Sequence, residues 1–447
     1  MLATQLSWPW RSVGLIAAVA LVTGVPTIRR DPRRPRWASR MRTQNTLAEF
    51  RVKLRGFGDP RYAFRRLFHH LPRGTFDDRA RWIVLDANAP YGVEAKLAEL
   101  RADPQIEEAF VAPETTLPTT APWAMLEDSC PISTPSFEPY QGYLGPAPFG
   151  IDAPAAWRLG ARGQGVWFAD IEGGWNAQHE DLPGDRITHV SGDEVRTPGW
   201  RPHGTAVLGE VVGRDNGKGV VGIAPDVERV FTSSIGGVAV ADAIDAAAEA
   251  LRPGDVLLIE LQSTGPRGRY VPVELWDDVF DAIKAATARG VIVVEAAGNG
   301  GEDLDHRIYR GAFDRKRRDS GAILVGAGGP PRPGYTDRAR LDFSNYGGRV
   351  DVQGWGRKVA TLDYGDLQAC AGADRHYTGE FSGTSSASPI VAGAAVLLES
   401  IARSRGRVLA PDEVRALLRR TGTPQAGNTR QAIGPRPDLG RAVVELR

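Results

Sequence analysis

Short apolar runs recur along the chain from about residue 165 onward, and polar or small residues follow each of them. The runs at 165–171, 255–259 and 291–296 have the pattern of strands that are buried on both faces, as in a parallel sheet. Amphipathic stretches at 390–405 and 411–420 predict two helices that cover such a sheet. The sequence therefore predicts an α/β domain with a mostly parallel sheet, whose functional residues lie at the carboxyl ends of the strands.

A different pattern occupies residues 47–117. Residues 82–86 (WIVLD) predict a strand, and residues 91–102 predict a helix whose apolar residues share one face. Residues 104–112 predict a returning strand. These elements indicate a small α+β module ahead of the larger domain.

Residues 118–138 are rich in Pro, Thr and Ser and show no periodicity. This composition predicts a linker, which is also the natural place for proteolytic processing. The larger α/β domain then occupies residues 139–447.

The first 46 residues allow two interpretations. Residues 13–25 form an apolar stretch of thirteen, which suits the core of a signal peptide and is too short for an ordinary membrane span. Only Arg11 precedes this stretch, whereas seven Arg and one Asp lie between residues 29 and 42, on the side that would have to cross the membrane. Either the segment directs export, or translation begins at Met41 and the product is cytoplasmic.

Composition narrows the choice of partners. The chain has 447 residues, which suits two domains with extensions, and its 55 basic and 54 acidic side chains show no bias toward nucleic acid. Two cysteines cannot make a disulfide framework. Cys130 and Cys370 can pair in an oxidising compartment or remain free thiols, and no cysteine or histidine spacing indicates zinc. No basic amphipathic helix points to a membrane surface.

The most informative segment is GTSSASP at residues 383–389, which precedes an apolar run at 390–398. A Gly-Thr turn there places the Ser385 hydroxyl at the N-terminus of a helix, where unpaired N–H groups and the helix dipole favour a developing oxyanion. Small neighbours leave room for a substrate backbone. Ser385 is therefore a candidate nucleophile, against the alternative of an ordinary serine cap on a buried helix.

A serine nucleophile needs a base, and the base needs an orienting group. His203 is the candidate base because it opens an apolar helical stretch between glycines. Glu172 and Asp170 lie at the end of the first predicted strand and are candidate acids, and Asn299 follows another strand as a candidate oxyanion donor. Taken alone, His203 would be a cap or surface residue and Asn299 a turn residue; their joint occurrence with Ser385 favours catalysis.

These blocks resemble the motifs of the subtilases, the subtilisin-like serine peptidases. HGT at 203–205, AAGN at 296–299 and the serine segment are similar to the family's histidine, oxyanion and serine motifs, in the family's order. Further similarity occurs at 219–225, 343–347 and 434–439, so that the match spans about residues 140–445. The resemblance implies a subtilisin-like, doubly wound fold and a serine endopeptidase that forms an acyl-enzyme.

The acid departs from the family's pattern. Subtilases normally have Asp there, followed by a small residue and Gly, with a His-Pro-Asp-Leu segment shortly after. In this chain HEDL at residues 179–182 stands in that place, and counting back seven residues from His179 reaches Glu172. A glutamate can take the same role if the backbones stand slightly further apart. Asp170 is the rival acid, on the same face but about 6.5 Å back along the strand.

The resemblance also implies a substrate edge. Glu260, Leu261 and Gln262 stand where subtilases have Ser-Leu-Gly, so we expect Leu261, Gln262 and Gly298 to bind the substrate, with backbone pairing of the β-addition type. A bulky Gln262 where Gly is usual would narrow the pocket wall. A polar strand end that carries no specificity is the alternative interpretation.

Two further features follow from the resemblance. Residues 47–117 are similar to the pro-domain that assists folding and plugs the site in subtilases, although a permanently retained accessory domain is the alternative. Asp181 and Asn216, with carbonyls of the loop at 214–220, match positions where many subtilases bind structural Ca²⁺. Arg214 and Lys218 bring positive charge to this loop and argue against calcium there. The chemistry itself requires no cofactor.

The sequence thus predicts a serine endopeptidase that acts on peptides or proteins and is associated with its own N-terminal module. Nucleic acid is not expected as a partner, nor is a membrane after maturation. Two other functions stay open. The departures at Glu172 and Gln262 allow a catalytically inactive, subtilisin-like scaffold that binds peptides, and subtilase-like macrocyclases instead pass the acyl group to an amine.

Overall fold

The computed structural model describes residues 49–54, 82–86, 93–104, 106–118, 130–370 and 372–446. The signal-like stretch and Arg-rich run predicted within 1–46 lie outside the described residues, as does most of the predicted linker at 118–138.

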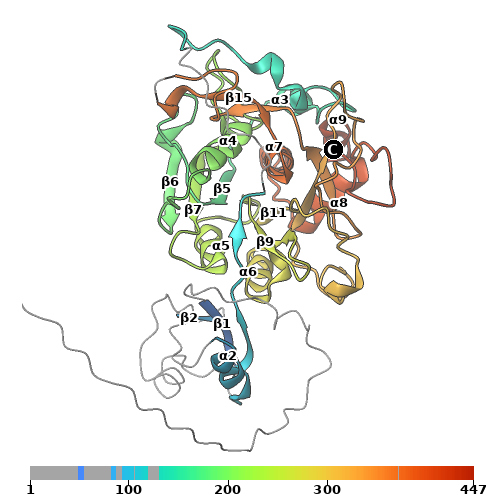
Figure 1. The fold of residues 1–447 in the computed structure, drawn as a ribbon. Helices are drawn as coiled ribbons and strands as arrows, with labels where there is room; N and C mark the ends of the chain where they lie inside the picture. Colours follow the sequence, from blue (N-terminus) through green and yellow to red (C-terminus); the bar gives the residue numbers. More distant parts are fainter. Residues whose placement is uncertain are drawn as a thin grey trace, which may run out of the picture. The chain divides into compact units, whose positions relative to one another are not determined.

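A seven-stranded sheet forms the centre of the large domain, and every neighbouring pair of strands is parallel (Figure 1). Its strand order is β13-β12-β11-β8-β5-β7-β6. The strands are β5 (Trp167–Glu172), β6 (Ile187–Ser191), β7 (Arg229–Ser234), β8 (Val256–Ile259), β11 (Ile292–Ala296), β12 (Ile323–Gly328) and β13 (Val352–Trp355). The three strands expected from the apolar runs are β5, β8 and β11, and the predicted α/β fold with a parallel sheet is confirmed. Since strand order reverses between β5 and β8, the carboxyl ends of these two strands form the usual place for a site.

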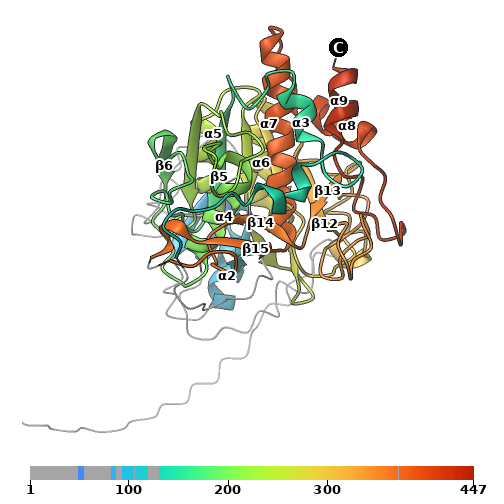
Figure 2. The same ribbon diagram turned by 90° about the horizontal axis from the view of Figure 1, so that it is seen from above.

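Helices cover both faces of the sheet (Figures 1 and 2). One face packs against α4 (Trp200–Val212) and α7 (Ser388–Ser404), and the other against α5 (Val240–Glu249) and α6 (Asp277–Ala288). Three shorter helices lie on the α7 side: α3 (Ala153–Trp157), α8 (Pro411–Thr421) and α9 (Leu439–Glu445).

The direction of side chains along β5 decides which residues can meet α4. Phe168 belongs to the apolar cluster on the α4–α7 side, whereas Ala169 and Ile171 belong to the cluster on the α5–α6 side. Because side chains alternate along a strand, Asp170 and Glu172 also face the α4–α7 side. Both acids are therefore placed on the face that carries the predicted histidine.

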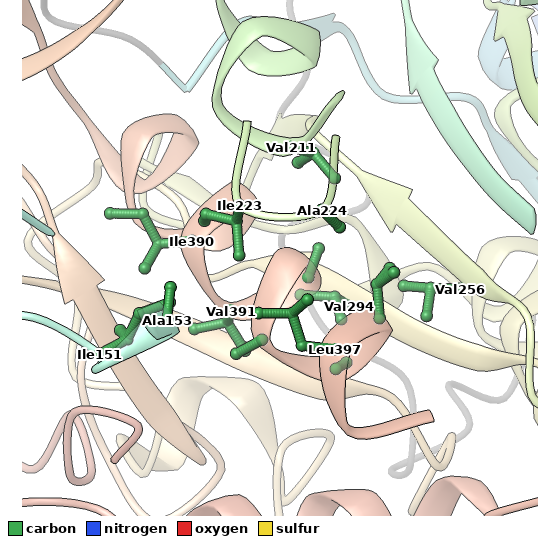
Figure 3. Packing of buried hydrophobic residues seen from close by; sticks show 14 of the residues in the cluster. Ile151, Ala153, Val211, Ile223, Ala224, Val256, Val294, Ile390, Val391 and Leu397 are labelled. Carbon is green, nitrogen blue, oxygen red and sulfur yellow. The ribbon is translucent and has the colours of Figure 1, made fainter. Parts of the chain in front are cut away.

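Helix α7 is the centre of the larger apolar cluster. Figure 3 shows its Val391 and Leu397 in one cluster with Val294 of β11 and Val256 of β8. The stretch Thr384–Ser404 is long and apolar enough to cross a bilayer, and its most apolar window is fully buried within the structure. It therefore packs as the core helix of a globular domain, and the turn that precedes it is rigidly placed.

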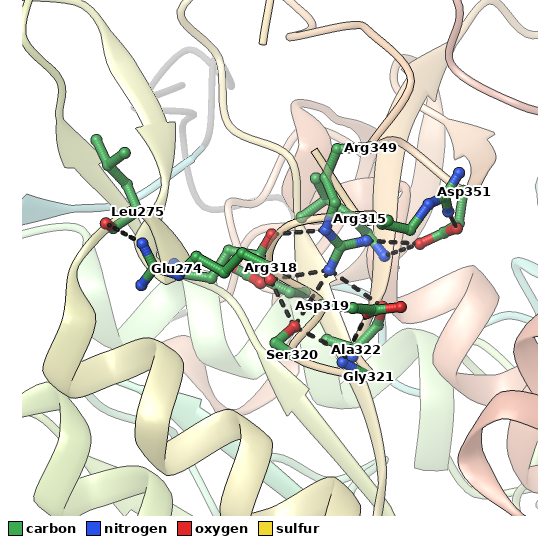
Figure 4. Close-up of polar contacts among 12 residues, drawn as sticks. Glu274, Leu275, Arg315, Arg318, Asp319, Ser320, Gly321, Ala322, Arg349 and Asp351 are labelled. Carbon is green, nitrogen blue, oxygen red and sulfur yellow. Dashed lines mark hydrogen bonds and ion pairs between the residues drawn. The ribbon is translucent and has the colours of Figure 1, made fainter. Parts of the chain in front are cut away.

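A buried ion network holds the β12–β13 side of the sheet (Figure 4). Arg349 is 1% exposed and donates to both oxygens of Glu274, at 2.6 and 2.8 Å, and to Asp351 at 2.8 Å. Asp351 also pairs with Arg315. Paired and hydrogen-bonded charges are the form in which buried charge is tolerated, so this network is structural and joins the segment before α6 to β13.

The N-terminal module contains an antiparallel sheet of order β2-β1-β3, made by β1 (Glu49–Leu54), β2 (Trp82–Asp86) and β3 (Ile106–Val111). Helix α2 (Val93–Ala102) packs its Leu97 and Leu100 against this sheet. Strand β1 is an addition to the predicted elements, although its alternation of Phe50, Val52 and Leu54 with charged residues is the signal of a half-buried strand.

The module contacts α6 of the large domain. Arg51 pairs with Asp278 at 3.2 Å and Lys53 with Asp281 at 2.8 Å. Phe110 of β3 stacks on Trp276, with ring centroids 5.5 Å apart.

Cys130 and Cys370 form a disulfide that joins positions 240 residues apart in the sequence. Pairing of the two cysteines was one of the two alternatives that the sequence left open.

Candidate active site

Glu172 and His203 form a buried pair. Glu172 is the last residue of β5, and His203 lies in the first turn of α4. The imidazole Nδ1 is hydrogen-bonded to Glu172 Oε1, and both side chains are 0% exposed. The second carboxyl oxygen of Glu172 accepts the N–H of Gly173 at 3.3 Å.

Asp170, the rival acid, contacts Trp175 instead of His203. Asp170 Oδ2 accepts the indole N–H of Trp175 at 2.8 Å, and its other oxygen has no partner within the described residues. The structure therefore brings Glu172 to the histidine and ties Asp170 to the loop that follows β5. No sequence signal marked Trp175 for this contact.

Two contacts allow α4 to approach that loop. A Cβ on Gly204 would lie 2.4 Å from the carbonyl oxygen of Gly174, so only glycine permits the helix to come this close. The N–H of Asn176 donates to Thr205 Oγ1 at 2.9 Å and joins loop to helix. The position of His203 against β5 thus depends on the residue that follows it.

Burial controls the protonation of the pair. Desolvation disfavours charged forms, and burial lowers the pKa of His203 to about 3. Burial also raises the pKa of Glu172 well above its usual range, and the hydrogen bond from Gly173 opposes this shift. Burial thus favours the neutral ring, which makes a T-shaped contact with Phe381 at a centroid distance of 5.4 Å. Its Nε2 is buried and has no hydrogen-bond partner in the part of the chain that the structure describes.

Ser385 faces a peptide carbonyl. It lies in the short turn η8 (Thr384–Ser386), just ahead of α7, and not in the helix itself. Its hydroxyl donates to the carbonyl oxygen of Pro118 at 2.6 Å, and its N–H donates to the same oxygen at 3.4 Å. The hydroxyl thus contacts a chain segment 267 residues earlier.

Asn299 presents its amide N–H₂ beside the serine turn. Its Oδ1 accepts the N–H of Thr384 at 3.0 Å and the Thr384 hydroxyl at 3.1 Å. Because the oxygen is held in this way, Nδ2 points elsewhere, and it is buried without a partner among the described residues. Thr384 also accepts the N–H of Gly298 at 3.1 Å. Thr384 thus fixes the orientation of the Asn299 amide, and it lies inside the serine motif although no sequence pattern pointed to this contact.

Residues 115–118 occupy the site as an added strand. β4 (Thr115–Thr116) pairs antiparallel with β9 (Gln262–Thr264), which in turn pairs with β10 (Tyr270–Pro272). From β4 the chain continues through Leu117 to Pro118 at the serine. Strand addition of this kind is a common mode of peptide binding. A cavity of about 210 Å³ lies beside Thr115 and is lined mainly by apolar side chains, Trp276 among them.

The three predicted substrate-binding residues have different surroundings. Gln262 donates from Nε2 to the carbonyl of Leu117 at 2.7 Å and so contacts the added strand directly. Leu261 is 0% exposed and belongs to the apolar cluster on the α5–α6 side. Gly298 has a φ of +89°, and a Cβ there would lie 2.9 Å from Asn345 Nδ2, so this position requires glycine.

The residues predicted to hold calcium face N–H donors. Asp181 Oδ2 accepts the N–H of Val220 at 2.8 Å, and Asp181 Oδ1 accepts Asn216 Nδ2 at 2.9 Å. Asn216 Oδ1 accepts the N–H of Lys218 at 3.1 Å, and the Lys218 ammonium pairs with Glu180 at 2.7 Å. Calcium binds through six to eight oxygen ligands, whereas the side-chain oxygens of Asp181 and Asn216 accept N–H groups in this structure. A calcium site here stays a prediction, and no step of the reaction depends on it.

A parallel α/β sheet, a buried histidine–carboxylate pair and a serine that faces a peptide carbonyl are together typical of hydrolases of the serine-peptidase class. Comparison with known proteins identifies the family: the model of the Subtilase family matches residues 165–434. An intracellular serine protease of Paenibacillus polymyxa is 31% identical over 284 residues, which cover 61% of this chain and 78% of that protein. Subtilisin DY of Bacillus licheniformis is 31% identical over 286 residues, covering 62% and 91% of the two chains.

A solved structure described as proteases from Pseudoalteromonas arctica PAMC 21717 has the same fold. It matches with a TM-score of 0.54 and 23% identity, covering 70% of this chain and 100% of that chain. The present chain belongs to the subtilase family, and it is a serine-type endopeptidase whose substrates are peptides or proteins.

Proposed function

We propose that the chain hydrolyses peptide bonds with Ser385 as nucleophile, His203 as base and Glu172 as the orienting acid. The main support for this proposal is the position of the Pro118 carbonyl. Its oxygen accepts hydrogen bonds from both the hydroxyl and the N–H of Ser385. A peptide carbonyl is thus presented to the candidate nucleophile at hydrogen-bonding distance.

The proton follows one route in this mechanism. The unpartnered Nε2 of His203 takes the Ser385 proton as the oxygen attacks the carbonyl carbon, and later gives it to the leaving amine. Glu172 accepts Nδ1–H, which fixes the tautomer and stabilises the imidazolium. Water, deprotonated by the same imidazole, then hydrolyses the acyl-enzyme and releases Ser385.

The negative charge on the tetrahedral intermediate needs donors. The Ser385 N–H already contacts the carbonyl oxygen, and the unpartnered Nδ2 of Asn299 is the second candidate donor. Loss of one such donor, as measured in subtilisin, lowers turnover by about 10²–10³. An inactive scaffold would have no use for an amide whose orientation is fixed by two bonds from Thr384.

We further propose that residues 47–117 act as a pro-domain and that the bond between Pro118 and Thr119 is the processing site. The pairing of β4 with β9 supports this, as do the ion pairs of Arg51 and Lys53 with α6. Each of these contacts holds the module against the large domain, and together they direct Pro118 to the serine.

The test uses the full chain and a fluorescent fluorophosphonate, followed by intact-mass analysis. Wild type should be labelled once and should lose residues 1–118, and Ser385→Ala should do neither. Glu172→Gln should be labelled much more slowly, whereas Asp170→Asn should resemble wild type. A correctly folded wild type that neither reacts nor processes itself would favour the inactive scaffold, and a joined rather than hydrolysed peptide product would favour amine transfer.

A further inference from the structure

We propose that the side chain of Gln262 closes the pocket for the residue on the acyl side of the scissile bond. The enzyme would then select substrates with proline or alanine at that position. This inference rests on the proposed peptidase function and adds the class of substrate to it.

The Gln262 side chain reaches from β9, which pairs with residues 115–116, to the turn at Asn299. Its backbone belongs to β9, which pairs with the added strand, and its Oε1 accepts the N–H of Asn299, which follows β11, at 2.8 Å. The residue is 2% exposed. The side chain therefore crosses the space between β9 and the Asn299 turn and is held at its far end.

The same amide also binds the peptide. Nε2 of Gln262 donates to the carbonyl of Leu117 at 2.7 Å and lies 3.4 Å from Thr116 Oγ1. With Oε1 on Asn299 and Nε2 on Leu117, both ends of the amide are satisfied, which is the arrangement that a buried polar group requires. The contact with Leu117 is to its backbone and does not depend on the side chain there.

The residue next to this amide in the bound segment is Pro118, which is buried and has a compact ring. A Cβ on Gly298 would lie 3.6 Å from Gln262 Oε1, so the backbone at Gly298 is close to the side-chain amide of Gln262. A long or aromatic side chain in place of Pro118 would have to displace Gln262. Displacement would leave the N–H of Asn299 and the carbonyl of Leu117 without partners, which is the costly outcome for buried groups.

The experiment compares four peptides on the full, self-processed chain. Succinyl-Thr-Thr-Leu-X-p-nitroanilide copies residues 115–118, with X as Pro, Ala, Leu or Phe. Wild type should cleave the Pro and Ala peptides with kcat/KM at least about 30-fold above that for Phe, since a Phe side chain would have to displace Gln262 and leave its two buried partners without hydrogen bonds. Gln262→Gly should raise the Phe-to-Ala ratio by about 30-fold or more.

Two matched variants separate size from hydrogen bonding. Gln262→Glu keeps the size but cannot donate to Leu117, so kcat/KM should fall about tenfold on all four peptides with their order unchanged. Gln164→Gly, an exposed glutamine ahead of the amino end of β5, should behave as wild type. Self-processing gives an independent readout in the chain's own segment: Pro118→Ala should be processed, and Pro118→Phe should be processed only together with Gln262→Gly.

Each outcome decides one claim. If wild type cleaves the Phe peptide as well as the Ala peptide, or processes Pro118→Phe, the closed pocket is refuted. The same holds if Gln262→Gly reacts with fluorophosphonate but keeps the wild-type order of peptides. If wild type cleaves no peptide and does not react with the fluorophosphonate, the peptidase mechanism itself fails, and the pocket inference falls with it.

Discussion

The role proposed for Glu172 predicts that its length matters as much as its charge. Glu172→Asp removes one methylene and withdraws the carboxylate by about 1.5 Å. The backbone cannot follow, because β5 is held between β7 and β8. α4 cannot approach either, since a Cβ on Gly204 would already lie 2.4 Å from Gly174 O. A hydrogen bond stretched by about 1.5 Å falls outside bonding distance.

The expected loss follows from that broken bond. A buried hydrogen bond to a charged group contributes about 1.5–3 kcal/mol, so Glu172→Asp should lower kcat/KM by about 10- to 150-fold. Glu172→Gln keeps the length but not the charge that stabilises the imidazolium, and should cost about 10³–10⁴. Asp170→Asn keeps an oxygen for the Trp175 indole and should change kcat/KM by less than about threefold.

The assay is kcat/KM for succinyl-Thr-Thr-Leu-Ala-p-nitroanilide on each self-processed variant, with fluorophosphonate labelling to count active sites. Variants that do not process themselves are compared by their labelling rate. The reasoning is wrong if Glu172→Asp is as active as wild type, or if Asp170→Asn is as damaged as Glu172→Gln.

Three further predictions concern stability. Glu210 is 0% exposed with both carboxyl oxygens unpartnered within the described residues, and burial raises its pKa well above the usual 4.5. The unfolded chain loses this proton above pH 4.5 while the folded chain keeps it, so wild type loses stability as pH rises; Glu210→Gln should be more stable relative to wild type at pH 7.5 than at pH 4.5. Denaturant unfolding at both pH values checks this, with the exposed Glu138→Gln as control, and a pH-independent gain would contradict it. Removing the long-range disulfide by Cys130→Ser together with Cys370→Ser should lower the free energy of unfolding by about 2–4 kcal/mol, and an unchanged unfolding curve would contradict this. Because the oxygens of Asp181 face N–H donors, Tm should be the same in excess Ca²⁺ and in EGTA; a clear rise with Ca²⁺ would show that the loop rearranges to bind the ion.

Local patterns were enough to predict the central elements. The strands β5, β8 and β11 and the core helix α7 all follow from apolar runs, because strands and helices buried on all sides need continuous apolar sequence. Counting from His179 pointed to Glu172, which the structure places on His203. Even β1 carried a readable alternation of apolar and charged residues.

The contacts that shape the site are not local, and for this reason the sequence did not reveal them. The carbonyl of Pro118 meets Ser385 across 267 positions, and Gln262 meets Leu117 across 145. The side chains of residues 117–118 do not indicate which residues they contact, because an added strand is recognised through its backbone. The position of Ser385 itself was local information: the Gly-Thr turn before the apolar run predicted it at the N-terminus of a helix, and the structure places it in η8, directly ahead of α7.

The two acids on one face of β5 have different hydrogen-bond partners. Both are fully buried, and burial raises the pKa of each. Among the described residues, Glu172 contacts His203, which can become positively charged, and Asp170 does not. In the proposed mechanism, a proton on the imidazole would therefore stabilise the charge of Glu172. Asp170 holds Trp175, whose ring lies 2.8 Å from where a Cβ on Gly204 would be, and so sets how closely α4 approaches the sheet. Under the proposed mechanism the first acid would act on the charge of the histidine and the second on its position. We therefore expect that Asp170 would not replace Glu172 in a Glu172→Gln variant.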